Sequence, residues 1–359
     1  MRTRTGSGSR SPTISSAVRT TWKRSTDRRY TSLVKFTSPL PITALSAAAV
    51  IGLGGCSVLP SSAGAPDGPF PQTIDSPYGT TTIEDAPTKI AVASPTDLDI
   101  ALALGAEPVI APATGGDDEF SPWVQSALED SGAEAPQTYD GTDGPDIAAI
   151  TQAEPDVILA TGLEDAGDHF DDLSEIAPVV AAAPDATWTD RTAAVATALD
   201  TADKAKQVVG DITTEAEDIA GRHLEFEDTT YTVADVQKSS IDYLSYDGSD
   251  DSFFSGLGLL PASAASSYSA EEHSVKKAKV DDLDADVLLI HFPDTGKGLL
   301  DESDLADPFY REVKVIRGKH YAVLSDDEFA ALTNLSPLSY PWLLDELPDA
   351  IGKAEQGEA

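Results

Sequence analysis

Residues 201–222 read TADKAKQVVGDITTEAEDIAGR, and this stretch has the apolar pattern of a long helix. Its apolar residues recur at steps of three and four, as Ala202, Ala205, Val209, Ile212, Ala216 and Ile219. Such spacing places side chains on one face of an α-helix. At about 1.5 Å per residue the stretch would be roughly 33 Å long, the width of a small domain. We therefore predict a rigid connecting helix at residues 201–223.

Alternating strand and helix patterns lie on both sides of the connecting helix. On the N-terminal side, the apolar run KIAVA at residues 89–93 is followed by a short helix pattern and then by the strand pattern EPVIAP at residues 107–112. A strand–helix–strand order implies parallel pairing with a right-handed crossover. On the C-terminal side, DVLLI at residues 286–290 repeats the strand pattern, and residues 340–351 predict a closing helix. The predicted fold is α/β, with two α/β lobes joined by a single long inter-lobe helix.

The chain has 359 residues, which is enough for two domains with their own cores. Residues 57–72 are rich in Pro, Gly, Ser and Ala, a composition typical of a flexible tether. The predicted segments are a signal peptide at residues 1–55, a flexible tether at 56–79, an N-terminal α/β lobe at 80–200, the connecting helix at 201–223, a C-terminal α/β lobe at 224–353 and a tail at 354–359.

The charge of the chain is strongly negative and unevenly distributed. The formal net charge is −37, yet residues 1–55 contain nine basic residues and a single acid, Asp27. Without that segment, 15 basic and 60 acidic residues remain, so the rest of the chain carries a net charge of −45. A protein with this much negative charge repels nucleic acid and anionic membrane surfaces. We therefore predict neither as a partner.

The N-terminal segment combines the features of an exported lipoprotein. The basic leader is followed by an apolar run at residues 40–53 and by the sequence LGGC at residues 53–56, a pattern that predicts a secretory signal. LGGC resembles the bacterial lipobox, which implies that Cys56, the only cysteine, carries a diacylglyceryl anchor. An uncleaved anchor or an ordinary signal peptide is the alternative. The predicted location is the extracytoplasmic face of the bacterial cell membrane, with the Sec and twin-arginine export routes left open.

Sequence motifs of common enzymes do not occur in this chain. It contains no G-x-S-x-G, no P-loop and no H-E-x-x-H. Its five histidines are not paired at the spacing of metal ligands. The acidic segment at residues 164–172 contains His169, and a solvated loop is favoured there over a cation site. We therefore predict a protein that is not an enzyme and has no catalytic residue, metal ligand or cofactor.

Aromatic residues are only 7% of the chain, yet several come shortly after predicted strands. They are Trp123, Trp188, Tyr243, Tyr246, Phe253, Phe254, Phe292, Tyr340 and Trp342. Ligands bind open α/β sheets beyond the strand ends, so these positions predict a ligand gap between the lobes. Core packing is the alternative for any single ring. Two facing rows of rings would suit a bulky, partly apolar ligand.

These features together resemble the periplasmic binding proteins of iron–siderophore ABC importers. The resemblance spans roughly residues 80–350 and is strongest in IAVASPTDLDIALALGAEPVIAPA, residues 90–113. It implies a shallow cleft that closes little and holds a ferric siderophore, haem or cobalamin without transforming it. By position it implies ligand contacts from Ser94, Pro95, Thr96, Thr114, Trp123, Thr161, Gly162, Leu163, Trp188, Lys238, Tyr243, Tyr246, Phe253, Phe254, Phe292, Leu338 and Tyr340.

Two departures from the family pattern bear on the partner and the ligand. Family members place a Glu on one helix of each lobe to dock onto permease arginines, whereas the aligned positions here are Ala148 and Ala278. The loops predicted to line the cleft contain few arginines, although an anionic ferric tricatecholate would need positive charge. A near-neutral ferric hydroxamate, haem or a mixed-ligand chelate fits better. The iron of a siderophore would be saturated by the chelator's own oxygens.

The favoured hypothesis is a monomeric lipoprotein that captures a ferric siderophore for an ABC permease. It predicts contact with the membrane through the lipid anchor only. One alternative is a cell-envelope interaction protein on the same fold that takes no part in transport. The other alternative is a haem or divalent-metal binding protein.

Overall fold

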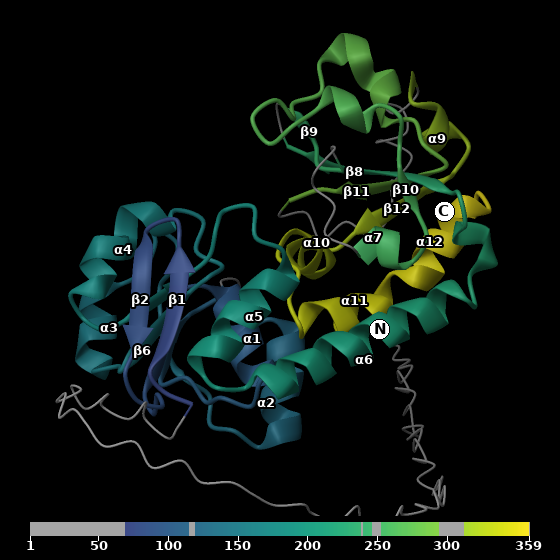
Figure 1. The fold of residues 1–359 in the computed structure, drawn as a ribbon. Coiled ribbons are helices and arrows are strands. Elements are labelled where there is room, and N and C mark those ends of the chain that lie inside the picture. The colour runs from purple at the N-terminus through teal and green to yellow at the C-terminus, as the bar shows by residue number, and fades with distance from the viewer. Residues whose placement is uncertain (1–68, 115–118, 238–239, 246–252, 294–311, 359) are drawn as a thin grey trace, which may run out of the picture. The chain divides into compact units, whose positions relative to one another are not determined.

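The structure is a computed structural model that describes residues 69–114, 119–237, 240–245, 253–293 and 312–358. Within these ranges the chain forms two five-stranded sheets, with the long helix between them in the sequence, and a separate two-stranded hairpin (Figure 1). Helices pack on the sheets in both lobes. The prediction of two α/β lobes joined by a long helix is confirmed.

The N-terminal lobe is built on a parallel sheet in the order β5-β4-β3-β6-β7. Its strands are β3 (Ile90–Val92), β4 (Ile110–Pro112), β5 (Gln137–Tyr139), β6 (Val157–Ala160) and β7 (Val179–Ala181). All of them except β5 are buried along their whole length, as expected for a parallel sheet covered on both faces. This burial explains why the strand sequences are continuously apolar rather than alternating.

Helices connect these strands, and their first residues fix the loops at the strand ends. The helices are α1 (Pro95–Ala103), α2 (Pro122–Ser131), α3 (Ile147–Ala153), α4 (Ala166–Ser174) and α5 (Trp188–Ala198). At the start of α1, the Ser94 hydroxyl accepts a hydrogen bond from the Asp97 N–H at 3.1 Å. At the start of α5, Thr187 and Asp190 form a capping box.

The connecting helix is α6 (Ala202–Ala220), which packs on α5, α7 and α11. Ala205, Ile212, Ala216 and Ile219 are buried, so the predicted apolar face is the packed face. Gly221 caps the C-terminus, and the helix therefore ends shortly before the predicted limit at residue 223.

The C-terminal lobe has a sheet in the order β10-β8-β11-β12, with β9 antiparallel to β8. Its strands are β8 (Thr230–Val236), β9 (Ile241–Tyr243), β10 (Leu260–Pro261), β11 (Val287–His291) and β12 (Tyr321–Leu324). Its helical segments are η1 (Leu224–Phe226), α7 (Phe253–Gly256), η2 (Ala265–Ser267), η3 (Lys277–Leu283), α9 (Lys314–Arg317), α10 (Asp326–Thr333), α11 (Ser339–Glu346) and α12 (Pro348–Glu355).

The C-terminal end of the chain differs from the prediction in two respects. The closing helix predicted at residues 340–351 is in fact two helices, α11 and α12, because Pro348 begins a new helix instead of continuing the first. The tail predicted at 354–359 begins too early, since α12 continues to Glu355 and Ala354 is buried. The ring nitrogen Nδ1 of His320 also lies 3.0 Å from the Ala354 carbonyl oxygen.

The tether predicted at residues 56–79 extends too far, because part of it is folded. β1 (Gln72–Ser76) and β2 (Gly79–Ile83) form an antiparallel hairpin. Ile74 and Ile83 are buried, and the Thr81 hydroxyl donates a hydrogen bond to the Val179 carbonyl oxygen at 2.6 Å. Two short strands with few apolar residues give a weak sequence signal, which the preceding Pro- and Gly-rich composition obscures.

The cores show how the two lobes are joined. One apolar core contains residues from both sheets, from α6 and from α11, whereas each sheet has a second, separate core on its other face. Ile90 and Val92 of β3, for example, belong to the shared core, and Ala91 belongs to the separate one. The two lobes are therefore held together by continuous side-chain packing as well as by the connecting helix.

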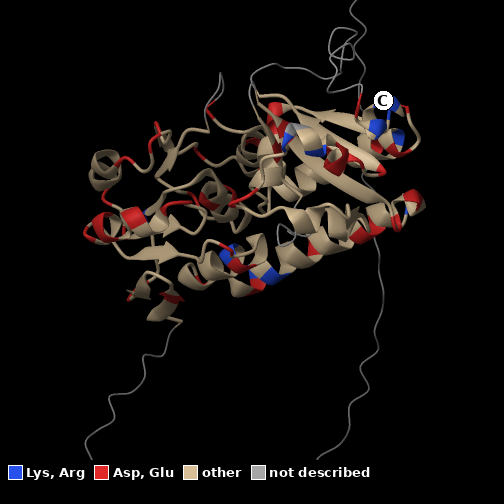
Figure 2. Cartoon of the chain, turned by 90° about the horizontal axis from the view of Figure 1, so that it is seen from above, with Lys and Arg blue, Asp and Glu red and all other residues tan. Residues whose placement is uncertain are grey.

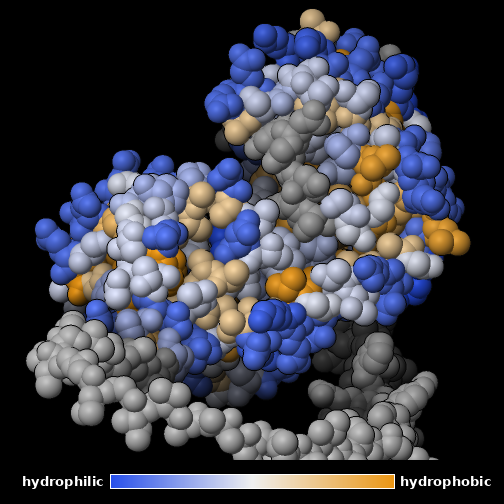
Figure 3. Space-filling view, in the orientation of Figure 1, coloured by the Kyte–Doolittle hydropathy of each residue, from blue (hydrophilic) through white to orange (hydrophobic). Residues whose placement is uncertain are grey.

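The described surface is predominantly acidic and polar. Acidic residues are spread over many helices and loops, while basic residues are fewer (Figure 2). In the space-filling view, hydrophilic residues cover much of the periphery of the described part of the chain (Figure 3). Among the described helices, none combines the length and the apolar character that crossing a membrane requires.

Candidate functional site

A cavity of about 540 Å³ is lined by residues of both lobes, and we call it the inter-lobe cavity. The N-terminal lobe contributes residues 161–164, after β6, and residues 182–187 and Arg191, after β7. The C-terminal lobe contributes Tyr231, Val233, Leu244, Ser245, Phe253, Phe254, Phe329, Leu332, Thr333, Asn334 and Leu335. Its N-terminal wall lies beyond the carboxyl ends of parallel strands, where open α/β sheets bind ligands.

Hydrogen bonds to Asp97 of α1 hold the loop after β6 in place. The Asp97 carboxylate accepts hydrogen bonds from the Thr161 N–H at 2.9 Å and from the Thr161 hydroxyl at 2.6 Å. It also accepts bonds from the Gly162 N–H at 3.2 Å and from the Ser94 hydroxyl at 2.6 Å. Burial raises the pKa of Asp97, and these hydrogen bonds oppose that rise. Asp97 thereby positions Thr161 and Gly162 at the cavity wall.

Position 162 requires a glycine because neighbouring side chains occupy the space that a Cβ atom would need. A Cβ atom at this position would lie 2.6 Å from the Ser94 hydroxyl and 2.7 Å from the Cβ of Thr96. Ser94 and Thr96 therefore support the cavity wall from behind and do not line it.

Arg191 supplies the single cation among the described residues that line the cavity. It lies in the first part of α5, it is half-buried, and its Nε atom has no hydrogen-bond partner within the described part of the chain. The lining acids Glu164 and Asp185 are exposed. A guanidinium group with a free donor can bind an oxygen acceptor of a ligand.

Aromatic rings form much of the wall from the C-terminal lobe. Tyr231 and Phe254 stack with ring centroids 4.0 Å apart, and Phe253 meets Phe254 edge to face at 5.2 Å. Phe329 of α10 lines the cavity as well. The wall also contains Thr161, Thr187, Ser245 and Thr333, and the hydroxyl groups of the three threonines donate hydrogen bonds within the protein. Together with Arg191, the rings give a surface for a partly apolar ligand that carries oxygen acceptors.

Five of the predicted ligand residues line the cavity, and others belong elsewhere. Thr161, Gly162, Leu163, Phe253 and Phe254 are in the cavity wall. The structure places Ser94, Pro95, Thr96, Thr114, Trp123, Trp188, Tyr243, Phe292, Leu338 and Tyr340 outside that wall. Lys238, Tyr246 and Cys56 lie outside the described residues.

Several of the rings predicted to contact a ligand are buried in cores. Tyr243 stacks on Tyr268 with centroids 4.4 Å apart, and it shares the separate core of the C-terminal lobe with Phe292. Trp123, Trp188 and Tyr340 belong to the shared core. A position shortly after a strand therefore does not determine whether a ring faces a cavity or packs beneath it.

The rings in the shared core connect the lobes. Trp123 of α2 lies 5.3 Å from Trp342 of α11, and Trp188 of α5 lies 5.6 Å from Tyr340 of α11, between ring centroids. Tyr340 also contacts Phe253, at 5.3 Å between centroids. We call this set the inter-lobe aromatic interface. Phe253 also lines the cavity, whereas the other rings of this set pack the two lobes together outside the cavity wall.

A buried carboxylate joins the lobes beside these rings. Asp99 of α1 accepts hydrogen bonds from the Trp123 indole N–H at 2.8 Å and from the Ser336 hydroxyl at 2.6 Å. Ser336 belongs to the C-terminal lobe and is held in turn by Ser339. Burial raises the pKa of Asp99 to about 7, and the charge of nearby Asp97 adds to the rise.

Sequence reasoning missed Asp99, Arg191, Tyr231 and Phe329. Arg191 was detectable, since it is a cation in the helix that follows a predicted strand. Asp99 and Ser336 are 237 positions apart in the sequence, and no local pattern relates them.

The two predicted docking positions are on the surface. Ala148 lies in α3 and Ala278 in η3, and both are exposed. Among the described residues, no group of three or more His, Cys, Asp or Glu side chains has an arrangement that could hold a metal ion.

Comparisons with known proteins identify the fold family. A model of the periplasmic binding protein family matches residues 90–327, about two thirds of the chain. No match was found among curated proteins. One similar solved structure is PiaA from Streptococcus pneumoniae in complex with ferrichrome, which is 22% identical, covers 79% of this chain and 99% of its own, and has a TM-score of 0.69.

Two further solved structures share the architecture. SirA from Staphylococcus aureus complexed with staphyloferrin B is 17% identical, with a TM-score of 0.62 and coverage of 78% of this chain and 98% of its own. FhuD2 from Staphylococcus aureus with bound ferrioxamine B is 15% identical, with a TM-score of 0.59 and coverage of 75% of this chain and 100% of its own. At these identities the similarity shows the fold. The family and these neighbours are binding proteins, in agreement with the prediction that the chain is not an enzyme.

Proposed function

This chain belongs to the periplasmic binding protein family, and we propose that it captures a ferric siderophore in the inter-lobe cavity for an ABC importer. The observation that carries the proposal is the composition of the cavity wall. Stacked rings from one lobe face loops of the other lobe that contain hydroxyl groups and one guanidinium group. A cavity of about 540 Å³ is within the range of small-molecule sites, about 300–1,000 Å³.

A near-neutral ferric hydroxamate is the ligand class that the lining supports best. Arg191 is opposed by two exposed carboxylates, those of Glu164 and Asp185, so the lining carries no excess of positive charge. A highly anionic tricatecholate would enter this acidic surrounding at an electrostatic cost. Arg191 donates hydrogen bonds to the hydroxamate oxygens, and the aliphatic linkers of the chelator pack on Tyr231, Phe254 and Phe329. Two of the similar structures hold ferrichrome or ferrioxamine B.

The proposal places this binding step at the extracytoplasmic face of the cell membrane. The N-terminal pattern up to Cys56 supports export and lipid anchoring, because the order of leader, apolar run and LGGC is that of a lipoprotein signal. The proposed partner is an ABC permease. Ala148 and Ala278 are exposed where family members carry docking acids, so we propose that neighbouring surface acids such as Asp146 make those contacts.

The experiment that tests the function is a ligand screen on the purified protein. We expect a ferric hydroxamate to raise the unfolding temperature, since a ligand at a hundred times its Kd stabilises by about 2.7 kcal/mol. The absorbing iron complex should also quench tryptophan fluorescence, because Trp188 is on the same helix as Arg191. Absence of a response to hydroxamate, catecholate and haem ligands alike would reject the proposal.

Replacing Arg191 by glutamine is expected to weaken hydroxamate binding about 10- to 100-fold. A hydrogen bond to a charged group contributes about 1.5–3 kcal/mol, and glutamine retains a donor without the charge. The measurement is the Kd by isothermal titration calorimetry, with thermal unfolding as a check on the fold. Arg222→Gln is the matched control, since Arg222 is exposed beyond the end of α6. An equal loss of affinity in both variants, or no loss of affinity in Arg191→Gln, would show that Arg191 does not contact the ligand.

A role outside transport is the second candidate, and the exposed alanines at positions 148 and 278 favour it. In that case the same fold serves a cell-envelope complex. A cross-linking pull-down from envelope membranes separates the two, since the transport function predicts a permease among the captured proteins and the alternative predicts cell-wall enzymes without one.

A further inference from the structure

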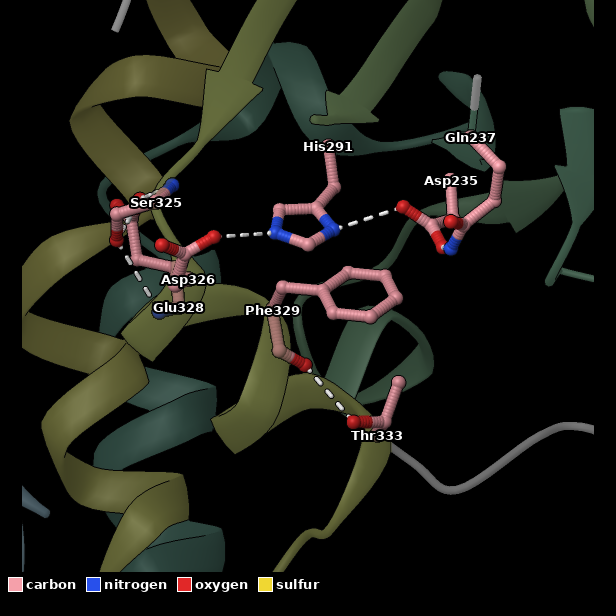
Figure 4. A network of polar contacts seen from close by, with 8 residues as sticks. All are labelled: Asp235, Gln237, His291, Ser325, Asp326, Glu328, Phe329 and Thr333. Carbon is pink, nitrogen blue, oxygen red and sulfur yellow. Dashed lines mark hydrogen bonds and ion pairs between the residues drawn. The ribbon is translucent and has the colours of Figure 1, made fainter. Parts of the chain in front are cut away.

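His291 is held between two carboxylates at the end of β11 (Figure 4). Its Nδ1 atom lies 2.8 Å from Asp235 Oδ1 of β8, and its Nε2 atom lies 2.9 Å from Asp326 Oδ1 of α10. The Asp235 carboxylate also accepts a hydrogen bond from the side-chain amide of Gln237. His291 is only 5% exposed, and Asp235 is buried with it. The imidazole ring therefore ties the first turn of α10 to two neighbouring strands.

With a proton on each ring nitrogen, the imidazole can donate to both carboxylates at once. A neutral imidazole has one N–H donor and one acceptor nitrogen, whereas an ionised carboxylate only accepts. A neutral ring would turn a lone pair toward one of the two carboxylates at hydrogen-bond distance. Two anions on opposite sides make charge-assisted hydrogen bonds to the doubly protonated ring. Within the described chain, the other carboxylates in this turn of α10 are Asp327 and Glu328, and Glu328 accepts hydrogen bonds from the N–H and hydroxyl of Ser325.

Phe329 connects this ion cluster to the cavity. Its ring stacks on the imidazole with centroids 3.9 Å apart and an angle of 8° between the planes. A cation lying over an aromatic face is attracted to it. Phe329 follows Asp326 by three residues, so one helical turn supplies both contacts to His291. Phe329 also lines the inter-lobe cavity together with Leu332 and Thr333.

We propose that His291 is a positioning residue of the ligand site, which holds Phe329 in the cavity wall by bridging Asp235 and Asp326 as an imidazolium. The Asp326 side chain is 60% exposed, so it gains water when the bridge is lost. Loss of the ring therefore frees the first turn of α10 and withdraws Phe329 from the cavity. The link to ligand binding rests on the proposed function, whereas the position of Phe329 can be tested without a ligand.

The first arm of the test is nuclear magnetic resonance on the ligand-free protein. We expect the ¹⁵N signals of both His291 ring nitrogens to have the shifts of protonated nitrogens at neutral pH. In His291→Gln, the ring signals of Phe329 and the methyl signals of Leu332 should move. Ser325→Ala removes the cap of α10 without touching His291, so it should lower stability and leave the imidazolium signals in place. A singly protonated ring, or unmoved Phe329 and Leu332 signals in His291→Gln, would overturn the proposal.

The second arm measures the affinity for a ferric hydroxamate that the wild-type protein binds. His291→Gln and Phe329→Leu are each expected to weaken binding about tenfold. The double variant should weaken binding by no more than either single variant, because both changes remove the same coupled contact. Ser325→Ala keeps the His291 bridge and should therefore lose less affinity than His291→Gln does. Wild-type affinity in His291→Gln would show that the bridge does not serve the ligand site. If the wild type binds no siderophore, the proposed function fails, while the first arm still decides the position of Phe329.

Discussion

Replacing Asp99 by asparagine is expected to stabilise the folded protein at pH 8 and to leave its stability almost unchanged near pH 4. Asp99 is buried at the junction of the lobes, and its pKa is raised from the ordinary value of 3.8 to about 7. Between those values the folded state retains a proton that the unfolded state releases. As the pH rises, the ionisation of Asp99 therefore lowers the free energy of unfolding. This loss of stability is complete above pH 7.

The size of the effect follows from the two pKa values. Their difference corresponds to about 4 kcal/mol at roughly 1.36 kcal/mol for each pH unit. Asparagine carries no charge at any pH, and its amide oxygen can accept the hydrogen bonds from Trp123 and Ser336. The gain at pH 8 is therefore expected to approach this figure, less the cost of accommodating the new NH₂ group.

Urea unfolding of the wild type and Asp99→Asn between pH 4 and pH 8.5 measures this difference. Asp130→Asn is the matched control, because Asp130 is exposed at the end of α2. Comparison with the control separates the effect of burying Asp99 from the effect of removing one negative charge from an acidic protein. A stability difference that does not change with pH would contradict a buried, proton-dependent carboxylate at this junction.

Replacing Tyr340 by alanine is expected to destabilise the protein by about 3–5 kcal/mol, the usual cost of removing a buried aromatic ring. Tyr340 is only 3% exposed and contacts the rings of Trp188 and Phe253. A Cβ at Gly256 would lie 2.6 Å from the Tyr340 hydroxyl oxygen, which shows how little free space surrounds this residue. Because Tyr340 belongs to the core shared by the two lobes, both lobes should lose stability together.

Chemical unfolding followed by tryptophan fluorescence and by circular dichroism checks the second prediction. Tyr340→Phe is the control, because it keeps the ring in the inter-lobe aromatic interface and should lose less stability than alanine does. If Tyr340→Ala lowers the free energy of unfolding by less than about 1 kcal/mol and also weakens siderophore binding, Tyr340 contacts the ligand and its structural role is contradicted.

The fold was largely predictable because its main signals are local. The continuous apolar strands and the periodic apolar face of α6 each occupy a short stretch of sequence. The strand β1 and its pairing with β2 were missed because β1 buries only one side chain completely. The division between α11 and α12 was missed because the apolar pattern continues through Leu347 and Pro348.

The lining of the cavity was predicted only in part, since sequence position does not give the direction of a side chain. Thr161 to Leu163 line the cavity because a loop after a buried strand must lie at the sheet's edge. Trp123 and Trp188 occupy comparable positions and yet pack into the shared core. The bridges made by Asp99 and by His291 join residues far apart in the chain, so they are visible only in the folded molecule.

The central claim is that an already chelated iron occupies the space between the two lobes. The most direct measurement compares amide signals of the ¹⁵N-labelled protein with a ferric hydroxamate and with its gallium(III) counterpart, which has the same shape and is diamagnetic. We expect the ferric complex to broaden the signals of Gly162, Tyr231 and Phe254, which line the cavity from both lobes. Broadening confined to one lobe or to a surface away from the cavity, or no difference between the two metals, would contradict the account.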